Sequence, residues 1–163
     1  MPPFQLLRGP SSRIPRLLAV LLGVLTTSLA GAQFASTPAP LPATELPPSE
    51  ALTEKAYRID GARHLYLTYP MQVLRGKLPP LIYAVAVTET TLDARGQVVK
   101  VDMVREPAVA KEVTPWIRQM ILRAQPFPAP ARLGESAVYT DIWLVDPKGR
   151  FQLDTLTEGQ RSD

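Results

Sequence analysis

The sequence predicts an α+β domain in which a small antiparallel β-sheet of three or four strands carries one or two helices on one face. Three observations lead to this fold class. Residues 81–105 contain two runs rich in β-branched residues, separated by an Asp-x-x-Gly turn, which is typical of a β-hairpin. Residues 114–124 place apolar side chains at helical spacing. Residues 137–155 contain a further strand pattern around an Asp-Pro-x-Gly turn.

The first 32 residues have the order of a secretory signal peptide. Arg8, Arg13 and Arg16 precede an uncharged run from Leu17 to Ala30, and Ala30-Gly31-Ala32 matches a small-x-small cleavage pattern. An uncleaved N-terminal membrane anchor is the alternative, although a spanning helix needs about 20 apolar residues and this run is shorter. We therefore expect the chain to be exported.

Composition limits the classes of function that need consideration. Residues 33–48 form a Pro-rich linker, which favours an extended chain without a core. The folded domain is expected at 49–157, followed by a flexible polar tail at 158–163. Of the 18 Lys and Arg residues, three precede residue 33, whereas all 15 Asp and Glu follow it, so the exported part is nearly neutral. We expect no nucleic-acid partner, which would need a basic face, and no disulfide because the chain has no Cys.

Residues 50–67 are predicted to form the first helix, with Ser49 as the N-cap. The Asp60-Gly61 pair leaves an alternative open. These residues could instead form the turn of a hairpin that joins Tyr57–Ile59 to His64–Tyr66.

The clearest strand follows, at Leu81–Thr91, because β-branched and aromatic residues dominate it. The turn at Asp93–Gly96 needs a residue that accepts a positive φ, and Gly96 is suited to it. Gln97–Arg105 is then the second strand, with Val99, Val101 and Met103 on one face.

The second helix is expected to begin with Thr114 as N-cap and Pro115 at the first helical position. Its core-facing stripe consists of Trp116, Ile117, Met120, Ile121 and Ala124. The helix ends before Pro126, because Pro126-Phe127-Pro128 fits neither a helix interior nor a central strand. We expect Phe127 to be a buried plug between two rigid prolines.

A third strand at 137–146 and a fourth at 150–155 complete the sheet around the turn Asp146–Gly149. Along the third strand, aromatic and acidic side chains share one face and aliphatic side chains share the other. If the aliphatic face packs on the helices, Tyr139, Asp141 and Trp143 form an exposed protein-contact surface. The alternative is that the first helix or the C-terminal extension covers the two aromatic residues.

No residue pattern indicates catalysis. His64 is the only histidine and is expected to be a surface or half-buried residue, because no second metal ligand or nucleophile is paired with it in the pattern. The carboxylates are scattered, and the glycines are isolated turn residues rather than a phosphate-binding loop. We therefore expect no enzyme activity, no cofactor and no metal.

Three motifs in order resemble the C-terminal domain of TonB-type energy transducers. The segment LDARGQVVKVDMVR at 92–105, which contains Asp93 and Gly96, resembles that family's turn and second-strand signature. The segment RAQPFPAP at 123–130, which contains Pro126, Phe127 and Pro128, resembles its helix-end motif. Tyr69-Pro70 lies where the family often has Tyr-Pro. The resemblance covers roughly residues 69–146.

This resemblance implies a non-catalytic protein-binding domain in the periplasm, with a periplasmic or outer-membrane protein as partner. TonB domains add an extended segment of their partner to an exposed sheet edge, which is β augmentation, and they serve energy-dependent transmembrane transport across the outer membrane. The implied docking edge is the third strand, and a returning fourth strand would occupy it. With a linker shorter than a transducer's spacer, the alternative is a structural or accessory cell-envelope protein without motor coupling. Such a protein would form a homodimer or bind another periplasmic protein.

Overall fold

The structure, a computed structural model, describes residues 46–161. The predicted signal peptide or anchor, linker residues 33–45 and the last two residues lie outside this part of the chain. Neither helix within residues 46–161 has the length and apolar composition needed to cross a membrane.

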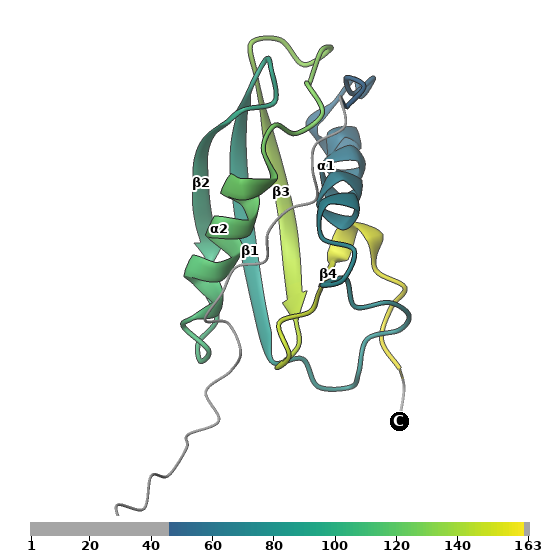
Figure 1. Cartoon of the computed structure of the whole chain (residues 1–163), viewed down its shortest axis with the longest axis vertical. Helices are drawn as coiled ribbons and strands as arrows, with labels where there is room; N and C mark the ends of the chain where they lie inside the picture. Colours follow the sequence, from purple (N-terminus) through teal and green to yellow (C-terminus); the bar gives the residue numbers. More distant parts are fainter. Residues whose placement is uncertain (1–45, 162–163) are drawn as a thin grey trace, which may run out of the picture. The chain divides into compact units, whose positions relative to one another are not determined.

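The fold is the predicted α+β arrangement. A four-stranded antiparallel sheet has the order β2-β1-β3-β4, and both helices lie on one face of it (Figure 1). The elements along the chain are α1 (Glu54–Thr68), β1 (Ala84–Asp93), β2 (Val98–Arg105), α2 (Val113–Ala124), β3 (Ser136–Val145), β4 (Phe151–Leu153) and the 3₁₀ turn η1 (Asp154–Leu156).

The segment containing Asp60-Gly61 is helical, so the alternative hairpin is wrong. The N-cap of α1 is Thr53 rather than Ser49, because the Thr53 hydroxyl accepts a hydrogen bond from the Ala56 amide at 3.1 Å. Gly61 has a packing role: a Cβ there would lie 3.1 Å from the ring of Tyr139. The missing side chain lets α1 approach β3 closely, which explains why a turn-forming residue occurs inside a helix.

Helix α2 has the predicted buried stripe of Trp116, Ile117, Met120, Ile121 and Ala124. Its start differs from the prediction, because the helix begins at Val113. Its N-cap is Glu112, which makes no side-chain capping bond, so Thr114 lies inside the helix.

The β1–β2 hairpin forms as predicted around Gly96, whose φ is +79°. The expected shared face of Val99, Val101 and Met103 is interrupted. A register shift at Thr91/Leu92 separates Val101, which is buried, from Val99, which is 66% exposed. A bulge of this kind turns a side chain away from its alternating position.

The C-terminal extension is part of the core. Strand β4 pairs with the end of β3, and the ring of Phe151 lies between Trp143 and Trp116, with centroid distances of 4.9 and 6.4 Å. Residues 158–161, predicted to be a flexible tail, lie against the α1–β1 connection: the Leu78 amide donates to the Gly159 carbonyl at 2.9 Å, and the Arg161 amide donates to the Leu78 carbonyl at 3.0 Å. The extension therefore joins the α1–β1 connection to the sheet.

Candidate functional site

The structure buries the three residues predicted as a possible contact surface. Tyr139, Asp141 and Trp143 are 1%, 0% and 0% exposed and face the helices, so an exposed patch of these residues is wrong. The alternative that α1 and the C-terminal extension cover them is correct. The physical reason is that the aromatic face of β3 offers more apolar area to bury than its aliphatic face.

Asp141 is the centre of a closed polar cluster between β3, α1 and η1. Its carboxylate accepts hydrogen bonds from the Ile142 amide at 2.8 Å and the Tyr139 hydroxyl at 3.3 Å, and it lies 3.7 Å from the Arg58 guanidinium. The Thr155 amide also donates to it, at 3.4 Å. Desolvation raises the pKa of Asp141 above its ordinary value, while the hydrogen bonds from Ile142 and Thr155 and the charge of Arg58 act in the opposite direction. The cluster holds the extension against α1.

His64 is also buried, contrary to the expected surface or half-buried position. Its Nε2 lies 2.6 Å from the Ala124 carbonyl oxygen, which only accepts, so Nε2 carries the proton. The imidazole packs on the ring of Phe127 with centroids 4.7 Å apart. Burial lowers the pKa of His64 below its ordinary value of 6.5, and the hydrogen bond to Ala124 partly offsets that effect. The neutral ring thus fastens α1 to the end of α2.

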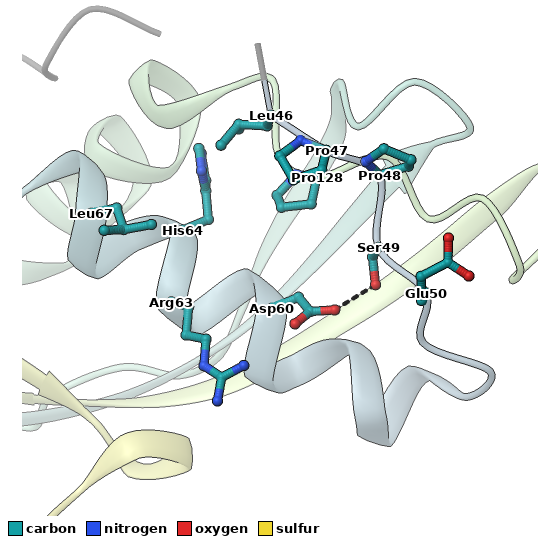
Figure 2. Close-up of a pocket in the computed structure, with 10 residues that line it drawn as sticks. All are labelled: Leu46, Pro47, Pro48, Ser49, Glu50, Asp60, Arg63, His64, Leu67 and Pro128. Carbon is teal, nitrogen blue, oxygen red and sulfur yellow. Dashed lines mark hydrogen bonds between the residues drawn. The ribbon is translucent and has the colours of Figure 1, made fainter. Parts of the chain in front are cut away.

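A pocket of about 370 Å³ lies beside His64, between α1, the segment before it and Pro128 (Figure 2). Figure 2 shows Leu46 and Pro47 near the imidazole, whereas Arg63 points away from it. At the other end, the Ser49 hydroxyl donates to the Asp60 carboxylate at 2.6 Å. His64 hydrogen-bonds to the Ala124 backbone, and the Ser49 hydroxyl and the Asp60 carboxylate hydrogen-bond to each other, so the imidazole is not paired with either of these two side chains. Nor do residues 46–161 contain a group of three or more His, Cys, Asp or Glu able to hold a metal.

The five motif residues named above come together in a structural role. Asp93 accepts from the amides of Arg95 and Gln97 at 2.9 and 2.8 Å, and so fixes the hairpin turn. The Gly96 carbonyl accepts from the Phe127 amide at 2.8 Å. Phe127 is 1% exposed, as predicted.

The two prolines complete this contact. Pro126 follows a cis peptide bond, and the Pro128 carbonyl accepts from the Tyr57 hydroxyl at 2.6 Å. The motif therefore connects the hairpin turn, the end of α2 and α1.

The edge of β3 that does not pair with β1 has partners along much of its length. Residues Trp143–Val145 pair with β4. Further along, the Val138 amide donates to the Glu54 carboxylate at 3.0 Å, and the Ile142 amide donates to Asp141. These contacts occupy the edge that the resemblance implies for docking.

Side chains from α2 and from its C-cap residue occupy part of the opposite edge, at β2. The Arg118 guanidinium donates to the Val101 carbonyl at 2.6 Å, and the Gln125 side-chain oxygen accepts from the Val98 amide at 3.0 Å. Capping of this kind protects an edge strand against pairing with another chain. Some backbone hydrogen-bonding groups of both edges therefore have partners within the domain, which the strand pattern alone did not indicate.

The sheet face opposite the helices carries an aliphatic cluster, here called the outer sheet patch. It consists of Val85, Val87, Ile142 and Leu144, which are half-buried and form neighbouring cross-strand pairs, Val85 with Leu144 and Val87 with Ile142. Within residues 46–161 both helices pack on the other face (Figure 1). Strict alternation along β1 and β3 could have located this patch, but the sequence did not show which face the helices cover.

No protein-family model, curated protein or solved structure matches this chain.

Proposed function

We propose that this chain is a non-catalytic protein-interaction domain of the cell envelope that acts in the periplasm. The observation that carries the proposal is the outer sheet patch. Cross-strand aliphatic pairs that are only half-buried favour contact with another protein surface. The ordered motifs at 92–105 and 123–130 support a design like that of the TonB C-terminal domain.

The contact surface in this proposal differs from a transducer's. Adding a strand to β3 would require displacing Glu54 and competing with β4, and adding one to β2 would require displacing Arg118 and Gln125. Each displacement exchanges one hydrogen bond for another and so contributes little net free energy. Within residues 46–161, burial of the outer sheet patch displaces no such contact. We therefore propose that the partner binds against the outer face of the sheet. We further propose, as a more specific function, that this contact serves energy-dependent transport across the outer membrane.

Photo-crosslinking in cells tests this function. A photoreactive amino acid replaces Val87, which belongs to the outer sheet patch, in the full-length chain. The matched control replaces Ile59, which is 41% exposed on α1. We expect a discrete adduct with an envelope protein from position 87 and none from position 59. Equal labelling at both positions, or no adduct at position 87, would contradict the proposal.

The mass of the adduct separates the alternative accessory role. An adduct of twice the chain mass indicates a homodimer formed through the outer sheet patch, whereas a heavier or lighter adduct identifies a different partner. A crosslink to an outer-membrane transporter would support the narrower transport role.

A further inference from the structure

The connection between α1 and β1, residues 70–83, exposes apolar side chains to an unusual degree. Met71 and Leu81 are 82% and 88% exposed, more than any other large hydrophobic residue in the described part of the chain. The same connection buries Leu74 and Leu78, at 9% and 5% exposure. Leu74 and Leu78 of the connection thus pack against the core, whereas Met71 and Leu81 are exposed to solvent.

This connection is held in place by backbone hydrogen bonds. The Leu74 amide donates to the Phe151 carbonyl at 2.8 Å, and the Leu78 amide donates to the Gly159 carbonyl at 2.9 Å. The Gln152 side chain, itself buried, donates to the Leu74 carbonyl at 2.6 Å. Figure 1 shows the connection at the lower end of the view, with the C-terminal segment beside it. The exposed side chains are therefore presented from a defined backbone.

The charge around the two exposed side chains has one dominant sign. From Gly61 to Thr88 the sequence contains no Asp or Glu. Arg75 and Lys77 are exposed, and neither forms a hydrogen bond or ion pair with the described residues. The neighbouring C-terminal segment adds the exposed Arg161. Among the described residues 157–161, this segment also adds the carboxylate of Glu158, which accepts from the Gly76 amide at 3.2 Å.

We propose that residues 70–83 dock onto an anionic phospholipid bilayer. Met71 and Leu81 would enter the interfacial region, and Arg75 and Lys77 would face lipid phosphates. Apolar side chains that project from a surface combined with unpaired cations match this environment, in which buried apolar area and attraction to anionic lipid act together. A protein partner is less well matched, because protein interfaces have a continuous apolar centre with few charges. The outer sheet patch has that composition, and this loop does not.

Single-site fluorescence labelling tests the docking. Because the chain has no cysteine, Leu81→Cys in the full-length protein accepts one environment-sensitive dye. The matched control is Val99→Cys, whose parent side chain is 66% exposed on β2. With vesicles that contain phosphatidylglycerol, we expect a blue shift and quenching by brominated lipid at position 81, and neither effect at position 99.

Charge dependence provides the second arm. Reversing both cations, Arg75→Glu with Lys77→Glu, should lower vesicle partitioning measured by the dye at position 81 by about tenfold or more. Phosphatidylcholine vesicles should give a similarly weak signal. An unchanged spectrum at position 81, an equal response at position 99, or a response to envelope proteins but not to vesicles would overturn the proposal. Attachment through the N-terminal segment would bring positions 81 and 99 near the bilayer together, so a response at position 81 alone reports docking of the loop and is independent of the partner bound at the outer sheet patch.

Discussion

Gly96 lies where the β1–β2 turn touches the proline-rich corner after α2. Its φ of +79° falls in the left-handed region, which disfavours residues with a side chain. A Cβ at this position would also lie 2.0 Å from the Phe127 carbonyl oxygen, a backbone atom that cannot move aside alone. Two separate constraints therefore require glycine here, whereas the sequence pattern indicated only the first.

The substitution Gly96→Ala should lower the free energy of unfolding by about 2 kcal/mol or more, because backbone strain and a steric clash add together. Gly76→Ala is the control. Gly76 has nearly the same φ, +78°, but no atom lies within 4 Å of its Cβ position. Its expected cost is only about 1 kcal/mol. Urea unfolding of both variants measures the difference, and equal losses would show that Gly96 and Phe127 are not in close contact.

The C-terminal extension, which contains β4, contributes both to the core and to the edge of the sheet. Strand β4 is only three residues long, yet Phe151 and Leu153 are fully buried and Gln152 is 2% exposed. The Leu153 amide donates to the Tyr66 hydroxyl at 3.0 Å, which connects β4 to α1. A short strand thus contributes to the core and to the closure of the β3 edge together.

Two truncations separate these contributions. Ending the chain after Gly149 removes β4, and we expect loss of the cooperative unfolding transition because a buried Phe alone contributes about 3–5 kcal/mol. Ending it after Thr157 keeps β4 but removes the contacts of Gly159 and Arg161 with Leu78. This second protein should fold with a lower melting temperature. Thermal unfolding followed by circular dichroism compares the two, and a stable fold without β4 would contradict its role in the core.

Elements with a strong local pattern could be predicted from the sequence. The hairpin turn, the α2 stripe, the buried Phe127 and the return of β4 along β3 all follow from residue spacing and turn chemistry. The covered face of β3 could not be predicted, because both faces carry large apolar residues and only packing against α1 distinguishes them. Gly61 illustrates the same difficulty, since its role depends on Tyr139, which is distant in sequence.

At the scale of the whole molecule, two buried titratable groups influence stability with opposite signs. The pKa of His64 is lowered, so its contribution is complete above the ordinary value of 6.5 and falls as the pH decreases through 6.5 toward the lowered pKa. The pKa of Asp141 is raised above 3.8, so the cost of burying its charge is removed as the pH falls through the raised pKa toward 3.8.

Below pH 6.5 we therefore expect His64→Gln to flatten the decline in the free energy of unfolding that the native chain shows. At lower pH, Asp141→Asn should remove the stabilising contribution from protonation of Asp141. Denaturant unfolding at a series of pH values measures both slopes. A native curve parallel to that of His64→Gln across pH 6.5 would mean that the imidazole has the same pKa in the folded and unfolded chains.

Side chains satisfy part of both sheet edges, and this has a consequence for solubility. Glu54, Arg118 and Gln125 satisfy backbone groups that another copy's strand could otherwise pair with. None of the three contributes to the apolar core, so a chain in which they are replaced should still fold. Its edge strands would then expose unpaired backbone N–H and C=O groups. Growth of such monomers into fibres needs only a repeated edge-to-edge contact. We therefore expect replacement of these three polar side chains to promote aggregation.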